Sequence, residues 1–513
     1  MKKFILFIII LLLIPACKNN DTLNSASGEK KPVHNESANE SETNDSAKPE
    51  EKEPEVAPTG MIKNIDGDAS DLPGNPETNA EYTEDNEDIY RTGKYTGPLV
   101  RGVTPDMLKP SFWIKLYSGS DSVIMTHEEI DKYNEENFKS LPYLNDFKTL
   151  PEKVKSGEVL GWINKLSTIP KSVRYDEKGK EYQQKEYEQL ESNLNTGEIR
   201  EVVDVKYGLT VMRTEMRTWP SVKGSFSSPS NRQIDYFTET AVYAAEPVLI
   251  YHTSADGQWY FAEIYNYKGW IPVKDVALCS GRDLVNYRAS RDLLVVKSPV
   301  MFTPESCDER VSRLQLDMGV TLPVVSESNS GYIVNYPVGN GNGLELVQMN
   351  IPFSEDVSAG FTDYSVKNVL IQAFKFLGEP YGWGGMNNAR DCSAFVADVY
   401  RSFGIIFPRN SDQQEKMKGY ISFNGKSREE RIKILDSLKP GTPLYMPGHA
   451  MIYLGRWQDR HYIIHDVPTV YRKESDGRLT AVRLDQVSVT PLDVLNSKGH
   501  EYIMLLTTAV VLD

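Results

Sequence analysis

Tyr381-Gly382-Trp383-Gly384-Gly385, followed closely by Arg390-Asp391-Cys392-Ser393, is the stretch that decides the fold of the C-terminal part of this 513-residue chain. The apolar run from Cys392 to Phe403 predicts a helix that ends at Gly404 and has Asp391 as its N-cap. A helix N-terminus carries partial positive charge and free N–H groups, which lower the pKa of a thiol and favour the nucleophilic thiolate. A buried, inert cysteine is the alternative interpretation.

Two histidines, His449 and His465, follow in apolar segments that are predicted to be paired strands. If the turn between the strands centres near Trp457, the two histidines lie directly opposite each other, and Tyr453 lies opposite His461. This register makes His449 the general base for the thiol and His465 the residue that orients the base. His461 is then a surface strand residue. A one-residue slip would break the pairing.

The same three side chains, Cys392, His449 and His465, could instead hold a zinc ion with water as the fourth ligand. The place of the cysteine at the start of a helix favours the nucleophile. The chain also has no Cys-x-x-Cys pattern, which argues against a structural zinc site. We therefore expect no metal and no other cofactor.

The segments around the thiol predict an α+β domain over residues 350–513. Asp363–Leu377 has apolar residues at helical spacing and is stopped by Gly378. Strands are predicted later in the chain, at Thr442–Tyr445, Ala450–Leu454, Tyr462–Val467 and Glu501–Thr507. Helices followed by an antiparallel sheet are typical of the α+β class.

Short β-like runs alternate with turn signals in residues 202–280. Glu246–Tyr251, then Asp256-Gly257 and Trp259-Tyr260, predict a hairpin with an Asp-Gly turn. Gly269-Trp270-Ile271-Pro272 is typical of small SH3-like barrels, and the stretch resembles the bacterial, cell-wall-associated kind. A second, weaker module is predicted at 281–349, with strands at Leu293–Lys297, Thr321–Val325 and Gly331–Tyr336.

The N-terminal part predicts an exported, tethered protein. A charged start, an apolar run and Ile14-Pro15-Ala16-Cys17 resemble a lipoprotein signal over residues 1–16, with Cys17 as the lipidated residue. Ordinary signal-peptide cleavage is the alternative. Residues 17–90 are polar and acidic, and we expect a disordered tether. Residues 91–201 are predicted to be mostly helical, with a capping signal at Thr126-x-x-Glu129 and no site.

The net charge limits the classes of binding partner, and the cysteine content bears on the redox environment of the protein. The net charge of -15 and pI of about 5.2, without a basic stripe, argue against nucleic acid as a partner. Cys279 and Cys307 remain once Cys17 and Cys392 have roles. They could form a disulfide in an oxidising compartment, or be two buried thiols, which we favour.

Several spaced blocks together resemble the NlpC-type cell-wall cysteine peptidases. The blocks are Tyr381-Gly382-Trp383-Gly384-Gly385, Asp391-Cys392-Ser393-Ala394-Phe395-Val396, Gly448-His449-Ala450-Met451-Ile452-Tyr453-Leu454-Gly455 and Ile464-His465. The resemblance implies a papain-like hydrolase of peptidoglycan peptides, with helices packed on an antiparallel sheet. A helical region, two SH3-like modules and this domain are similar to a subgroup that cleaves the γ-D-glutamyl–diamino acid bond.

The resemblance also implies a role for each matching residue of the catalytic centre. Cys392 would be the nucleophile, His449 the general base and His465 the residue that orients it. Tyr381 would supply a hydroxyl near the oxyanion. The backbone N–H of Cys392, at a helix start, is physically suited to the same task.

Further residues would bind the substrate peptide. Asp391 and Ser393 would hold it, with Asp391 near its free amine, and Trp383 and Ser411 would line the pocket. In related enzymes the residue before that serine is often acidic. Here it is Asn410, which removes a charge from the pocket.

The first SH3-like module would close one side of the cleft, with Glu239 and Tyr267 as candidates for the amine and wall contacts. Such a cleft favours short muropeptides with a free N-terminal L-Ala, whose ammonium pairs with carboxylates. We expect a monomer in the bacterial cell envelope, anchored by a lipid on Cys17, with peptidoglycan peptides as its partner. The alternatives are a non-catalytic peptidoglycan-binding scaffold and a thiol amidase or acyltransferase on the same fold.

Overall fold

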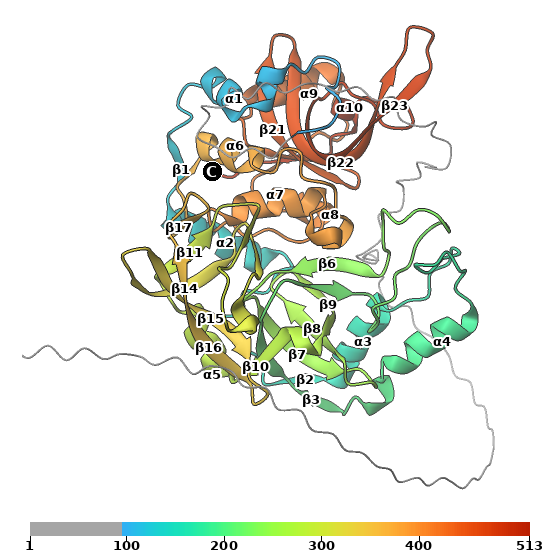
Figure 1. Ribbon diagram of the computed structural model, residues 1–513. Coiled ribbons are helices and arrows are strands. Elements are labelled where there is room, and N and C mark those ends of the chain that lie inside the picture. The colour runs from blue at the N-terminus through green and yellow to red at the C-terminus, as the bar shows by residue number, and fades with distance from the viewer. Residues whose placement is uncertain (1–94) are drawn as a thin grey trace, which may run out of the picture. The chain divides into compact units, whose positions relative to one another are not determined.

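The computed structural model describes residues 95–513, which lie within one compact unit (Figure 1). The predicted signal peptide, the lipidation site Cys17 and the tether lie outside the described residues. Among the helices of residues 95–513, none combines the length and the apolar character that a membrane span requires.

The described N-terminal segment is rich in helices. Its elements are α1 (Pro110–Leu116), β1 (Val123–Met125), α2 (His127–Ser140), β2 (Lys153–Lys155), α3 (Ser156–Leu166) and α4 (Gln184–Asn193). The predicted capping box is confirmed at the start of α2. The Glu129 amide donates to the Thr126 hydroxyl at 3.3 Å, and the Glu129 carboxylate accepts from the Thr126 amide at 2.8 Å.

Buried side chains of this segment are shared between two hydrophobic cores. Trp113 of α1 packs in the same core as Phe395 of the C-terminal domain. Ile163 of α3 packs with Trp270 of the first β-rich module. Strand β1 also pairs with β18 (Tyr364–Ser365), which precedes the first helix of the C-terminal domain. The segment therefore connects the first module and the C-terminal domain.

The first module is built on a seven-stranded antiparallel sheet in the order β10-β4-β7-β8-β9-β5-β6. The strands are β4 (Lys206–Thr210), β5 (Thr214–Arg217), β6 (Thr238–Val242), β7 (Pro247–Thr253), β8 (Trp259–Ile264), β9 (Tyr267–Pro272) and β10 (Val276–Cys279). Strand β3 (Val202–Asp204) pairs with β2. The predicted hairpin joins β7 to β8, and Gly257 has the positive φ of 70° that its turn requires.

The second module follows α5 (Gly281–Arg288). Its five-stranded sheet has the order β16-β15-β14-β11-β17, beside a separate β12-β13 pair. The strands are β11 (Leu293–Val296), β12 (Val300–Phe302), β13 (Gln315–Asp317), β14 (Thr321–Glu327), β15 (Gly331–Gly339), β16 (Leu344–Pro352) and β17 (Val357–Ala359). Cys279 and Cys307 are free cysteines and not a disulfide, but the prediction that both are buried is wrong, because Cys279 is half-buried and Cys307 is exposed.

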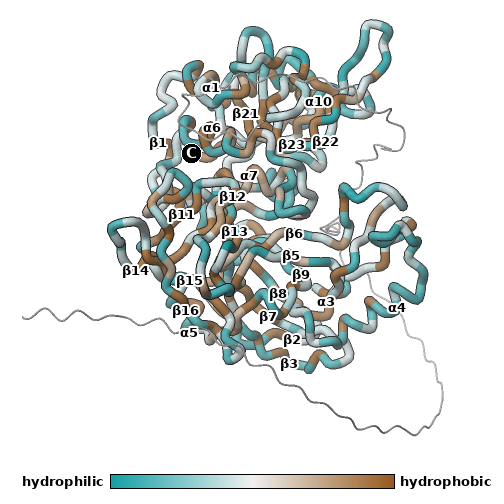
Figure 2. The backbone as a smooth tube through the Cα atoms, viewed as in Figure 1, coloured by the Kyte–Doolittle hydropathy of each residue, from teal (hydrophilic) through white to brown (hydrophobic). Residues whose placement is uncertain are grey.

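The C-terminal domain confirms the α+β prediction. Its helices are α6 (Val366–Phe374), α7 (Cys392–Arg401), α8 (Ser411–Gln414), α9 (Arg428–Ser437) and α10 (Tyr502–Leu505). Its sheet has the order β19-β24-β20-β21-β22-β23, with bounds Tyr420–Ser422, Thr508–Val510, Pro443–Met446, His449–Trp457, Arg460–Lys473 and Leu479–Pro491. Figure 2 shows hydrophobic stretches along the buried elements, whereas the tube around α4 is mostly hydrophilic.

Two predictions for this sheet need correction. The strand predicted at Glu501–Thr507 is wrong, because Tyr502–Leu505 forms the short helix α10 and the strand begins only at Thr508. A short apolar run is compatible with either a helix or a strand, so the spacing of its apolar residues could not distinguish the two. Strand β23 was not predicted, since its first residues, Leu479 to Arg483, are exposed or half-buried and show no alternation of apolar and polar side chains.

Candidate active site

Cys392 is the first residue of α7, as predicted. Asp391 caps the helix, and its Oδ1 accepts the Ala394 amide at 3.0 Å. The backbone amide of Ala450 hydrogen-bonds the Cys392 thiol, which is only 5% exposed. Ala450 follows His449 at the start of β21, so this contact places the backbone of His449 next to that of the residue that binds the thiol.

The two histidines meet as predicted. Nε2 of His449 lies 2.8 Å from Nδ1 of His465, and the ring centroids are 5.1 Å apart. The other ring nitrogen of His465, Nε2, lies 3.0 Å from the hydroxyl of Thr490. The ring of Tyr502 packs against both imidazoles, with its centroid 6.2 Å and 6.0 Å from theirs.

The strand register that was predicted to bring the histidines together is wrong. The turn is shorter than expected, since Trp457 pairs with Arg460, and a bulge follows before Ile452 pairs with Ile464. Continuing that register places His449 diagonal to His465 and not directly opposite. The error is an even number of residues, so both side chains stay on one face of the sheet and still meet.

The assignment of His461 as a surface residue is also wrong. Its ring is buried, at 5% exposure, and Nδ1 lies 2.7 Å from the Tyr453 hydroxyl. This second histidine–tyrosine contact lies toward the turn, away from the catalytic pair. It holds the hairpin together without touching Cys392.

Burial governs the protonation of the catalytic groups. It lowers the pKa of His449 to about 4 and holds that of His465 well below its usual value, with the neighbouring His449 adding to the effect. Burial, aided by the charge of Asp391, raises the pKa of Cys392 to about 12. The expected lowering by the helix N-terminus is therefore outweighed, and the pair rests as a neutral thiol beside a neutral imidazole.

Asp391 and Ser393 belong to a buried network around Arg409. Arg409 donates to Oδ2 of Asp391 at 2.5 Å and to the Ser393 hydroxyl at 2.9 Å, while the Gly384 amide donates to Asp391 at 3.0 Å. Burial opposes ionisation of Asp391, but Arg409 and the hydrogen bonds hold its pKa below the usual value. This pairing was not predicted, because Arg409 is in the loop that follows α7 and no local pattern marks it as a partner of Asp391.

Tyr381 and Trp383 lie on the segment that leads to the nucleophile. Burial, and then the nearby Cys392, hold the pKa of Tyr381 well above its usual value, so its hydroxyl keeps its hydrogen. The indole Nε1 of Trp383 is buried and has no hydrogen-bond partner among the described residues. That ring packs near Tyr236 of the first module, with centroids 6.4 Å apart.

Glu239 and Tyr267 come together in the first module. Glu239 accepts hydrogen bonds from the hydroxyls of Tyr267 and Thr218, the second at 2.5 Å. Burial raises the pKa of Glu239 despite these bonds. The catalytic loop packs on the same strand, since a Cβ at Gly385 would lie 2.5 Å from that of Ala241 on β6. The first module thus borders the catalytic centre.

Ser411 begins α8 and is buried at 9% exposure. Asn410 caps this helix with its side chain, in a capping box with Gln413. The residue that replaces the acidic group of relatives therefore has a local structural role here.

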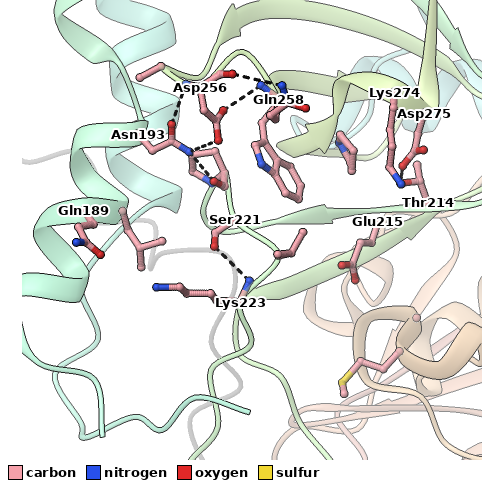
Figure 3. Close-up of a pocket in the computed structure, with 18 of the residues that line it drawn as sticks. Gln189, Asn193, Thr214, Glu215, Ser221, Lys223, Asp256, Gln258, Lys274 and Asp275 are labelled. Carbon is pink, nitrogen blue, oxygen red and sulfur yellow. Dashed lines mark hydrogen bonds between the residues drawn. The ribbon is translucent and has the colours of Figure 1, made fainter. Parts of the chain in front are cut away.

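A separate cavity of about 1040 Å³ lies among α4, the first module and the loop Gly385–Asn388 (Figure 3). Its labelled polar side chains include Glu215, Lys223 and Asp275. Cys392 and His449 are not in its lining, so this cavity is distinct from the catalytic centre. Within residues 95–513, no group of three His, Cys, Asp or Glu is arranged to hold a metal ion.

Comparisons with known proteins agree with this geometry. Residues 378–480 match the NlpC/P60 family, and residues 225–272 match the SH3 domain of the SH3b1 type. A γ-D-glutamyl-L-lysine dipeptidyl-peptidase of Bacillus cereus is 27% identical over 152 residues, which is 29% of this chain and 44% of that protein. The chain thus spans less than half the length of this relative.

A γ-D-glutamyl-L-lysine dipeptidyl-peptidase of Bacillus subtilis is 23% identical over 265 residues, covering 48% of this chain and 81% of that protein. A solved NlpC/P60 endopeptidase from Photobacterium damselae subsp. piscicida has the same fold. Its TM-score is 0.64 at 18% identity, over 78% of this chain and 96% of that one.

Proposed function

Because residues 378–480 form an NlpC/P60 domain of the cysteine peptidase class, preceded by an SH3 domain, we propose that this protein hydrolyses peptidoglycan stem peptides. The bond cleaved is the γ-D-glutamyl–diamino acid bond, in short muropeptides with a free N-terminal L-Ala. The proposal rests on one observation above all: the thiol of Cys392 accepts from the amide of Ala450, the residue next to His449, and His449 pairs with the buried His465.

The reaction follows from the neutral resting pair. As Sγ of Cys392 attacks the γ-carbonyl carbon of D-Glu, the thiol proton passes to His449. The backbone N–H of Cys392 and the protonated hydroxyl of Tyr381 donate to the oxyanion. His449 then gives its proton to the leaving amine, and a water molecule, deprotonated by His449, releases the acyl group from sulfur.

Recognition of the free amine is assigned to Glu239 more than to Asp391. The carboxylate of Asp391 is already paired with Arg409 at 2.5 Å. The hydrogen-bond partners of Glu239 are two hydroxyls, so its charge is available for a substrate ammonium. Tyr267 then fixes the orientation of Glu239, and the half-buried Trp383 supplies an apolar wall with an unused indole N–H.

The lipid anchor and the location in the cell envelope are proposals supported by the sequence around Cys17. Incorporation of labelled fatty acid by the full chain, but not by Cys17→Ala, tests the lipidation. Label in both proteins, or in neither, would refute the anchor and leave the catalytic proposal standing.

The decisive experiment compares L-Ala-γ-D-Glu-meso-diaminopimelate with its N-acetylated form, using Cys392→Ala as the control. Cleavage of the free-amine peptide alone, lost in Cys392→Ala, supports the full proposal. Equal cleavage of both peptides would support the peptidase activity and would refute the proposed recognition of the free amine. If neither is cleaved while the protein binds sacculi, the scaffold alternative replaces it. Transfer of the acyl group to an added amine would instead identify an acyltransferase.

A further inference from the structure

Nε2 of His465, the ring nitrogen that does not face His449, contacts one more residue beside the active site. Its Nε2 lies 3.0 Å from Oγ1 of Thr490 on the adjacent strand β23, where Thr490 pairs with Ile463. Both side chains are fully buried, at 0% exposure. The contact extends the hydrogen-bonded pair of His449 and His465 by one hydroxyl.

The direction of these hydrogen bonds follows from the task of His449. Its Nε2 faces Nδ1 of His465 at 2.8 Å, so its own Nδ1 is left to take the thiol proton. A neutral imidazole carries one hydrogen, which must then be on Nε2 of His449 and be donated to His465. His465 is also neutral, because burial keeps its pKa well below the usual value. It must therefore carry its hydrogen on Nε2 and donate it to Thr490.

We propose that Thr490 is a positioning residue that holds His465 in the tautomer required for catalysis, an inference that rests on the proposed function. In the other tautomer, His465 donates from Nδ1 to His449. His449 would then present a hydrogen, instead of a lone pair, to the thiol. Thr490 favours the productive arrangement by accepting the Nε2 hydrogen, because a buried N–H without an acceptor is costly and rarer than a bare acceptor.

Two substitutions at this position separate the hydroxyl from the packing. Thr490→Val keeps the shape and removes the acceptor, and we expect kcat to fall about 10- to 100-fold at nearly constant KM. Thr490→Ser keeps the hydroxyl and should retain most of kcat. Ser488→Ala is the matched control. Ser488 lies opposite His465, is equally buried, and donates its hydroxyl to the Gln486 carbonyl at 3.0 Å and not to the ring.

A second readout does not depend on peptide hydrolysis. Alkylation of the full chain by iodoacetamide, with mass spectrometry of the peptide that holds Cys392, measures how readily His449 draws the thiol proton. Cys279 and Cys307 are internal references in the same sample. Thr490→Val should slow alkylation at Cys392 alone, and Thr490→Ser should restore it.

The outcomes distinguish the two proposals. If wild type cleaves no muropeptide but the alkylation pattern is found, the proposed function fails and the role of Thr490 stands. Thr490→Val with wild-type kcat and wild-type alkylation overturns the role of Thr490. So does a loss in Thr490→Ser equal to that in Thr490→Val, because the hydroxyl would then not be the cause.

Discussion

Arg213 of the first module and Asp317 of the second meet at 3.2 Å, Nε to Oδ1, and the same oxygen accepts from Arg390 at 2.8 Å. Arg390 stands two residues before the nucleophile and is buried at 1% exposure. Arg213 also donates to the carbonyls of Gly385 (3.3 Å) and Ala389 (3.0 Å). The two modules thus hold the loop that leads to Cys392.

Breaking this cluster should reduce stability and kcat together. We expect Asp317→Ala to lower the free energy of unfolding by about 3 kcal/mol, because Arg213 loses its carboxylate partner in a buried site. Chemical denaturation measures the loss, and muropeptide kinetics should show kcat falling more than KM rises. Glu305→Ala, in an exposed pair with Arg313 of the same module, should cost at most about 1 kcal/mol. Equal effects of the two variants would contradict this role of Asp317.

His449 and His461, two buried histidines of one hairpin, should differ in the effect of substitution: the first on kcat and the second on stability. His449→Ala removes the general base, and kcat should fall by about 10²- to 10⁴-fold with the fold retained. His461→Gln should leave kcat nearly unchanged and lower the melting temperature, because the contacts with the Tyr453 hydroxyl and the Asp436 carboxylate are lost, and neither is catalytic. Kinetics and thermal unfolding of both variants make the comparison. A large fall in kcat for His461→Gln would show that the catalytic line is assigned to the wrong histidines.

Glu239→Gln should weaken recognition of the free amine. The loss of a charge-assisted hydrogen bond, worth about 1.5–3 kcal/mol, predicts a rise in KM of roughly 10- to 100-fold for the free-amine tripeptide. The small residual rate on the N-acetylated peptide should not change. Lys274→Ala, an exposed residue of the separate cavity, is the control and should behave as wild type. An unchanged KM for the free-amine peptide would remove Glu239 from the binding site.

The fall of kcat/KM on the acidic side of the pH profile should occur well below pH 6.5, the ordinary pKa of histidine. Burial lowers the pKa of His449 from 6.5 to about 4, so the base can still accept a proton in mildly acidic solution. The thiol, with a pKa of about 12, keeps its hydrogen at neutral pH. A pH–rate profile for the free-amine peptide should therefore be flat from about pH 5 to about pH 7, and it should fall above about pH 8 as the substrate ammonium loses its proton. An inflection near pH 6.5 would contradict a neutral, buried pair.

Folding stability should decline over the same acidic range. Unfolded His449 binds a proton below its ordinary pKa of 6.5, whereas the buried ring does so only near 4. The stability due to the neutral ring is thus complete above pH 6.5 and falls as the pH drops towards 4. His461, whose pKa burial also lowers to about 4, acts in the same direction. Denaturant midpoints should fall between neutral and acidic pH, and by less in His461→Gln.

Local signals were enough to predict much of the catalytic centre. The capping aspartate fixed the start of α7 at Cys392, because a cap acts within one helical turn. The contact between His449 and His465 was predicted despite the wrong register. Which face of the sheet a side chain occupies depends only on whether the error in register is odd or even. The bulge at Tyr453 makes the error even, so both rings lie on one face.

The remaining features depend on contacts that a sequence does not display. Asp317 and Arg390 are 73 positions apart, and nothing near Asp317 marks it as part of the active-site scaffold. Arg409 reaches Asp391 only because the loop after α7 folds back over the start of that helix. Thr490 lies on β23, a strand that was not predicted because its first half shows no alternation of apolar and polar side chains.

The contacts of Arg213 and Asp317 with the loop before Cys392 limit how the domains of this protein can be recombined. A gene fusion that carried residues 350–513 alone would leave Arg390 without one of its three carboxylate partners. It would also lose the guanidinium that grips the carbonyls of Gly385 and Ala389. Any other module put in place of the β-rich ones would have to supply an equivalent aspartate and arginine to keep the catalytic loop in position.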